Sequence, residues 1–321
     1  METEWLRLNA AGGGSPLLSY LFLAVVTASA SAINSVAGGG TILTFPALAA
    51  ILPHGPTQLV IANVTSKIGL WPGALAAAWE YRHERRDQPP WAVWLLLPSL
   101  LGSLLGTALI MVLPPSLFER LVPWLILVAA VLFAIQPRLS GWLAVRGKSP
   151  PGSLPANADD RSPTWATPEH AEGFQGCQSQ HPAAADDFHV HGQPGRPSQG
   201  LLLLAAGLQF AVAIYGGYFG AGIGILMLAV LGSLELGDIH LLNGVKNVLG
   251  MAINAAATLL FALGSLFGWT EVAWPEAAVM AVAAVAGGLA GGRLARRCSP
   301  RAIRRLVAVI GFALAGYHLL S

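Results

Sequence analysis

A glycine-rich interruption inside a hydrophobic stretch is the feature that most limits what this chain can fold into. Residues 34–41 read Asn-Ser-Val-Ala-Gly-Gly-Gly-Thr, and an apolar run over 42–52 follows directly. Successive glycines disfavour a helix interior because they lose the most backbone entropy on folding. A bilayer tolerates broken backbone only where protein or a wet cavity covers it. We therefore expect Gly38, Gly39 and Gly40 to form the tip of a helical hairpin, whose second arm starts with N–H groups that favour anions.

The same pattern occurs a second time. Residues 216–224 form another glycine-dense break between apolar runs. A helix with a polar patch follows each break, reading Asn-Val-Thr-Ser-Lys at 63–67 and Asn-Gly-Val-Lys-Asn at 243–247. The next helix in each half carries a Gly-x-x-x-Gly pair, which is typical of close helix packing; the pairs are Gly102 with Gly106 and Gly287 with Gly291. This recurrence in the same order indicates an internal duplication.

The composition places the chain in a membrane. Hydrophobic residues make up 54% of the 321 positions and charged residues only 11%, far from an ordinary soluble domain. No region alternates with period two, so strands are not predicted. Several runs reach the roughly 20 residues that a spanning helix needs. They are 17–36, 57–79, 91–113, 117–135, 240–263, 276–294 and 303–320.

The basic residues predict how the halves are oriented. They gather after the second, fourth and sixth of these spans, and the positive-inside rule makes all three loops cytoplasmic. This requires each hairpin to enter and leave on one face, so that the two halves are inverted. We predict an all-α polytopic protein with a first repeat at 1–136, a disordered cytoplasmic linker at 137–199 and an inverted second repeat at 200–321, each repeat being a broken hairpin plus three spanning helices.

The chain offers little for a cofactor, a metal or an enzyme. The linker contains His189 and His191 near an acidic pair, but a solvated polar loop is the favoured interpretation because no ligand geometry is enforced there. Cys177 and Cys298 have no metal spacing. Hydrolase and phosphate-loop motifs are absent, and the formal charge of +2 is too small to suggest nucleic acid. We expect no enzyme activity, no cofactor and no metal.

Two lysines inside predicted spans carry the functional interpretation. Lys67 and Lys246 occupy equivalent places in the two halves, each about 15 Å inside its helix, and no Asp or Glu is expected at that depth. Charge inside a membrane is costly and marks functional sites. Facing cations predict an anionic occupant; the alternative is that each lysine snorkels or caps a carbonyl of the adjacent hairpin.

Other donors are expected around the same place. They lie on the faces of the lysine-bearing helices or at the hairpin tips, so that amides, hydroxyls and helix N-termini would converge on an oxyanion. Each hydroxyl taken alone could instead satisfy broken backbone. With the glycines and the lysines, the predicted binding residues are Asn34, Thr41, Asn63, Ser66, Tyr218, Gly220, Gly222, Asn243 and Asn247.

At these motifs the sequence resembles the sulfite exporter TauE/SafE family of membrane permeases. The resemblance lies in residues 34–46, 63–67, 216–225 and 243–247, and it covers nearly the whole chain apart from the linker and the first dozen residues. It implies a secondary transporter in the bacterial cytoplasmic membrane that moves sulfite, sulfonates or thiosulfate.

We therefore expect a multi-pass inner-membrane permease working by alternating access around a midplane site. Its partners would be a small sulfur oxyanion or organosulfonate and the membrane lipid, with homo-oligomerisation left open. Two alternatives remain at this stage, a non-transporting membrane scaffold or assembly protein and an anion channel.

Overall fold

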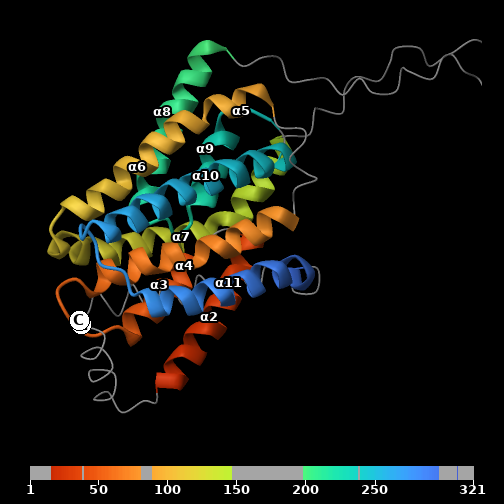
Figure 1. Ribbon diagram of the computed structural model, residues 1–321. Coiled ribbons are helices and arrows are strands. Elements are labelled where there is room, and N and C mark those ends of the chain that lie inside the picture. The colour runs from red at the N-terminus through yellow and green to blue at the C-terminus, as the bar shows by residue number, and fades with distance from the viewer. Residues whose placement is uncertain are drawn as a thin grey trace, which may run out of the picture. The chain divides into compact units, whose positions relative to one another are not determined.

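The computed structural model describes residues 16–37, 40–80, 89–146, 198–237, 239–295 and 309, and every regular element within them is a helix (Figure 1). The helices are α2 (Pro16–Ala37), α3 (Thr41–Ile51), α4 (Gln58–Glu80), α5 (Pro90–Trp94), α6 (Leu96–Val112), α7 (Pro115–Arg146), α8 (Gln199–Tyr218), α9 (Ile223–Ser233), α10 (Ile239–Leu266) and α11 (Trp274–Ala295).

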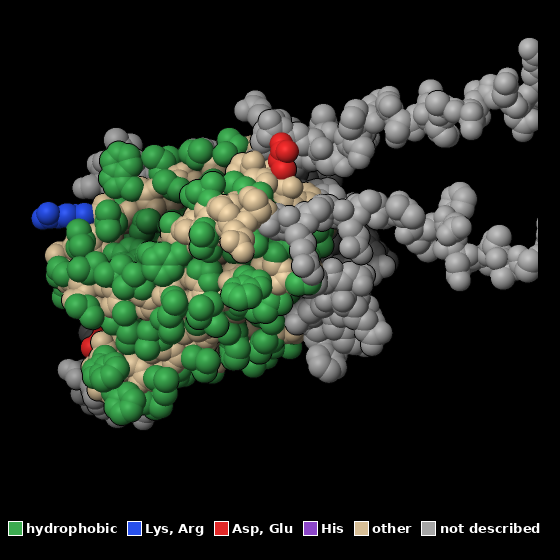
Figure 2. All heavy atoms as spheres, turned by 90° about the horizontal axis from the view of Figure 1, so that it is seen from above, with side chains coloured by type: hydrophobic (Ala, Val, Ile, Leu, Met, Phe, Trp, Pro, Cys, Tyr) green, Lys and Arg blue, Asp and Glu red, His purple; other side chains and the backbone are tan. Residues whose placement is uncertain are grey.

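The helical surface suits a bilayer. Six stretches among the described residues are long and apolar enough to cross a membrane, and large side chains such as Leu97, Leu101 and Leu104 on α6 are exposed. Figure 2 shows hydrophobic side chains over most of the visible face of the described part, with few charges. A surface of this kind is unfavourable in water and favourable against lipid. The prediction of an all-helical, multi-pass membrane protein is confirmed.

Each glycine-rich break ends one helix and precedes a short one. The short helices α3 and α9 have 11 residues each, which is about 16 Å or half of a hydrocarbon core. Gly40 precedes α3, while Gly220 and Gly222 lie before α9 with φ of 86° and 75°. This left-handed region is costly for residues with a side chain, so glycine suits both positions. Gly38 and Gly39 lie outside the described residues.

The helices pack in two similar groups. In Figure 1, α2 and α4 lie against α11, and α8 lies against α6, which also contacts α10. Ser31 Oγ on α2 donates a hydrogen bond to the carbonyl of Ala284 on α11 at 2.7 Å, and Ser103 Oγ on α6 donates to the carbonyl of Ile253 on α10 at 2.7 Å. The hairpin helix of each half therefore packs against the glycine-pair helix of the other half.

The paired glycines allow these helices to approach closely. A Cβ at Gly102 would lie 2.8 Å from the Cβ of Ala213, and one at Gly106 would lie 2.9 Å from the backbone nitrogen of Tyr218. At Gly287 on α11, a Cβ would lie 2.7 Å from backbone of α2. These separations are too short for a real side chain. The close packing predicted for these three glycines is present, whereas the surroundings of Gly291 are not described.

Two predicted boundaries differ from the structure. The expected span 91–113 is divided at Leu95 into α5 and α6. Helix α7 continues to Arg146, so the first ten residues of the predicted linker 137–199 are helical. The remaining linker residues up to 197 and the predicted span 303–320, apart from Val309, lie outside the described residues.

Candidate functional site

A buried lysine on α4 lies at the centre of the candidate site. Lys67 is 5% exposed, and its Nζ donates to the carbonyl oxygen of Gly216 at 2.7 Å and also to that of Gly217. Both carbonyls belong to the last turn of α8, where backbone oxygens lack partners within the helix. A cation there also interacts favourably with the negative end of the helix dipole. The lysine of the first half thus stabilises the break in the second half.

Two further side chains contact the same turn. Asn63, one helical turn before the lysine on α4, is fully buried and donates from Nδ2 to the carbonyl of Tyr218 at 2.9 Å. Thr107 on α6 donates to the carbonyl of Gly217 at 3.4 Å. Asn63 Oδ1 and Tyr218 Oη are buried, with no hydrogen-bond partner within the described chain. Buried polar atoms without partners are uncommon, so these two are candidate ligand contacts.

The turn between α8 and α9 is held in a defined conformation beside the ammonium. Tyr215 Oη donates to the carbonyl of Ala221 at 2.6 Å, and the amide of Phe219 donates to the carbonyl of Tyr215 at 2.8 Å. A Cβ at Gly220 would lie 3.6 Å from Lys67 Nζ. The first residues of α9, which begins three positions later, therefore follow a turn that touches the lysine head group.

Polar side chains close the first hairpin and join it to α4. Asn34 Oδ1 on α2 accepts a hydrogen bond from the amide of Gly40 at 3.3 Å. Thr44 on α3 and Ser66 on α4 are fully buried, and their hydroxyl oxygens lie 2.5 Å apart. Thr41 is the first residue of α3 and is half-buried. Of the predicted binding residues, Asn34 and Gly40 therefore close the hairpin, and Ser66 joins it to α4.

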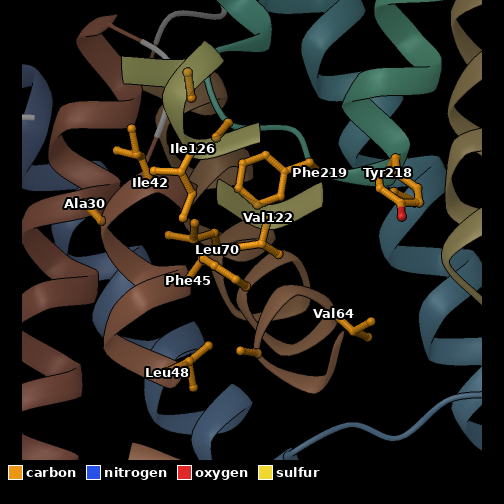
Figure 3. Close-up of a cluster of buried hydrophobic side chains, with 14 of the residues drawn as sticks. Ala30, Ile42, Phe45, Leu48, Val64, Leu70, Val122, Ile126, Tyr218 and Phe219 are labelled. Atoms are coloured by element: carbon orange, nitrogen blue, oxygen red, sulfur yellow. The ribbon is translucent and has the colours of Figure 1, made fainter. Parts of the chain in front are cut away.

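Aromatic contacts bring the two hairpins together. The ring of Phe45 on α3 meets that of Phe219 in the second break edge to face, with centroids 5.6 Å apart, and Phe118 on α7 meets Tyr218 at the same separation. Figure 3 shows Phe45 and Phe219 in one cluster with Ile126 of α7. The short helix of the first hairpin thus contacts the break of the second, in apolar surroundings.

The contacts of the second lysine differ from those of Lys67. Lys246 is 9% exposed, and its Nζ donates to Oδ1 of Asn243 on the same helix at 3.1 Å; both residues make additional interactions. The side chain of Asn247 is exposed. The structure therefore brings Asn63, Lys67, Tyr218 and the second glycine break together, whereas a meeting of the two lysines across a pseudo-twofold axis stays a prediction.

A carboxylate on α11 lies level with the buried lysine of α4. The amide of Ala273 donates to Thr65 Oγ1 at 3.1 Å, and a Cβ at Gly69 would lie 2.6 Å from the Cβ of Met280. These contacts align α11 with α4, so Glu276 lies level with the turn of α4 that carries the buried lysine. The sequence alone did not place this carboxylate level with the lysine, because hydropathy does not show how two helices are aligned.

Comparison with known proteins gives a family and two relatives. Residues 21–318 match the family described as "Sulfite exporter TauE/SafE". The chain is 24% identical over 303 residues to a "Probable membrane transporter protein" of Haemophilus influenzae, covering 94% of each chain. It is 30% identical over 125 residues to "Probable membrane transporter protein ORF9" of a Sinorhizobium species, covering 38% of this chain and 45% of the relative. No solved structure matches the chain.

Proposed function

Because the chain belongs to the sulfite exporter TauE/SafE family, we propose that it is a secondary transporter that carries a sulfur-containing anion across the bacterial cytoplasmic membrane. The family consists of membrane permeases and is not a family of enzymes. The proposed substrates are sulfite, a sulfonate or thiosulfate. All of them carry a negative charge and have oxygen atoms that accept hydrogen bonds. The other expected partner is the surrounding lipid.

The buried ammonium of Lys67 carries this proposal. A charged lysine inside a membrane protein is costly unless it is paired, and here two backbone carbonyls are its described acceptors. Carbonyl oxygens carry only partial charge, so an oxyanion is a stronger partner for an ammonium. The nearby start of α9 adds the positive end of a helix dipole. An anion between Lys67 and Gly220 to Gly222 would contact both the ammonium and the N-terminus of α9.

Anion binding would change the hydrogen-bond partners of Lys67, and this change links binding to movement of α4 relative to α8. With no anion bound, Lys67 holds α4 against the last turn of α8. An anion that takes over the ammonium leaves the carbonyls of Gly216 and Gly217 with fewer donors, which weakens the contact between α4 and the break. A ligand shifts a conformational equilibrium only through contacts that differ between the two states, and this exchange supplies such a difference.

Alternating access is the proposed form of that movement. The packing of α2 on α11 and of α8 on α6 repeats one arrangement in both halves, which supports an inverted duplication. Transporters built from such repeats bind substrate where the halves meet, at discontinuous helices. Rocking of the halves around the contact between α3, α4 and the α8–α9 turn would open the site to each face in turn.

The test is flux of labelled anions into liposomes containing the full-length protein. Sulfite, thiosulfate and an organosulfonate are each offered, and Lys67→Gln is compared with Arg120→Gln, which changes an exposed cation on α7. We expect flux of the first variant to fall about tenfold or more, because a hydrogen bond to a charged group contributes about 1.5–3 kcal/mol and about 1.4 kcal/mol is tenfold. The control should keep its flux.

The same experiment separates the alternatives. A carrier speeds up labelled uptake when unlabelled anion is present inside, whereas a channel does not and conducts far above carrier rates. A scaffold binds and moves none of the anions although it folds. Normal flux in a correctly folded Lys67→Gln variant would remove the lysine from the mechanism.

A further inference from the structure

A buried carboxylate on α11 is not used by the mechanism above. Glu276 lies in the first turn of α11 and is 3% exposed. Its Oε1 accepts a hydrogen bond from Tyr20 Oη of α2 at 3.4 Å, and its own backbone amide is also a donor. Its Oε2 is buried and has no hydrogen-bond partner among the residues described. A buried polar atom without a partner is uncommon.

The described residues offer no cationic side chain beside this carboxylate, which lies in the first turn of α11. Of the helices packed against α11, α2 presents the phenol of Tyr20, and the cationic side chain of α4, Lys67, is directed to the carbonyls of α8. Glu271 in the loop before α11 is exposed. Within the described part of the chain, Glu276 therefore has no cation as a partner. A buried carboxylate without a cationic partner is costly, and binding of a proton lowers that cost.

Glu276 and the lysine lie on two helices that pack closely against each other. A Cβ at Gly69 of α4 would lie 2.6 Å from Met280 of α11, and one at Gly73 would lie 2.7 Å from backbone of Ala284. At these positions no side chain fits between the two helices. The alignment of the two helices also places the carboxylate and the ammonium at one level along α4, on opposite sides of that helix.

From this geometry we propose that Glu276 binds the proton that is transported together with the anion. Its unpaired Oε2 takes a proton from water, forming a neutral acid, and returns it to water on the other side. Removing a negative charge level with Lys67 on the other side of α4 favours an anion at the lysine by simple electrostatics, and linkage makes the effect reciprocal. Anion binding therefore favours proton uptake, which makes the transporter a proton–anion symporter. The inference rests on the proposed function.

Two measurements on the full-length protein test it, with thiosulfate as the probe because this anion does not itself titrate near neutral pH. In weakly buffered detergent solution, thiosulfate binding should take up protons from the medium. In liposomes, an inward proton gradient should drive accumulation of labelled thiosulfate. We expect Glu276→Gln to lose both effects while it still exchanges internal for external thiosulfate, because exchange needs no net proton movement.

Three comparisons decide the outcome. Glu271→Gln, which alters the exposed carboxylate nearby, should keep proton uptake and accumulation, and Glu276→Asp should restore both in part. The symport would be overturned if wild-type flux did not depend on the proton gradient, or if Glu276→Gln still took up protons. The proposed function would stand in either case. A wild-type protein that neither binds nor moves any of the three anions would overturn the proposed function, and this inference with it.

Discussion

At the level of single residues, the last turn of α8, before the second glycine break, depends on hydrogen-bond donors supplied by another helix. The carbonyls of Gly216, Gly217 and Tyr218 accept from Lys67 and Asn63, both of which lie on α4. A buried carbonyl without a donor costs about 1–3 kcal/mol. These side chains therefore stabilise the fold of the site as well as offering groups to an anion. The capping alternative weighed from the sequence is present for Lys67, although on the hairpin of the other half.

A change at Asn63 should reveal this structural role. Asn63→Asp replaces the Nδ2 donor by an oxygen that faces the carbonyl of Tyr218, so we expect the free energy of unfolding to fall by about 1–3 kcal/mol. Unfolding in a detergent titration followed by circular dichroism measures the change. Asn247→Asp is the control, since its side chain is exposed. Equal stability of the two variants would show that the bond from Asn63 contributes nothing.

The sequence predicts which polar residues gather at the site better than what they contact. Asn63, Lys67 and Tyr218 do lie together, because their motifs stand at fixed distances from the breaks. Their partners are backbone carbonyls, which every residue has and which no side-chain pattern indicates. The buried position of Glu276 was missed for a related reason, because the depth at which α11 begins depends on its packing against α4.

At the level of elements, glycine acts here through close helix contacts. A Cβ at Gly106 on α6 would lie 2.9 Å from backbone of α8, whereas one at Gly207 on α8 would meet nothing within 4 Å. Both residues lie inside helices, so helix propensity affects them alike. The pair thus separates the effect of packing from the effect of backbone entropy.

We expect the two alanine variants to change the stability of the protein in opposite directions. Gly106→Ala should destabilise the protein by about 1–3 kcal/mol, because the added methyl group forces α6 and α8 apart. Gly207→Ala should leave stability unchanged or raise it by up to about 1 kcal/mol, the usual gain of alanine over glycine in a helix. The same detergent titration measures both. Similar destabilisation by the two changes would contradict the close approach of α6 and α8.

The sequence predicts helices better than their ends. The expected spans 57–79 and 117–135 correspond to α4 and to most of α7, since apolar length is a direct signal. The extension of α7 to Arg146 was missed because Pro137 and the polar residues after it resemble a loop. The apolar residues at 139, 142 and 143 keep a helical spacing that would have indicated the continuation.

For the whole molecule, helix directions follow from the contacts between neighbours. Helices α4 and α11 are parallel, because Ala273 contacts Thr65 and Ala284 adjoins Gly73. Trp274 at the start of α11 donates to Ser265 near the end of α10, so α10 begins at the opposite end of the bundle. Within this bundle, the turn before α4 and the turn before α10 therefore lie at opposite ends.

This arrangement gives a topology that can be measured. Gly55 lies in the exposed turn before α4, and Glu235 lies in the exposed turn before α10. Arginines follow α4 and α11, so the positive-inside rule places Gly55 outside and Glu235 in the cytoplasm. In a variant with both native cysteines changed to serine, Gly55→Cys should react with a membrane-impermeant maleimide on intact cells, and Glu235→Cys only after permeabilisation. Halves duplicated in parallel would instead place both turns on one face, so labelling of the two cysteines from the same side would reject the inverted repeat and the alternating-access mechanism built on it.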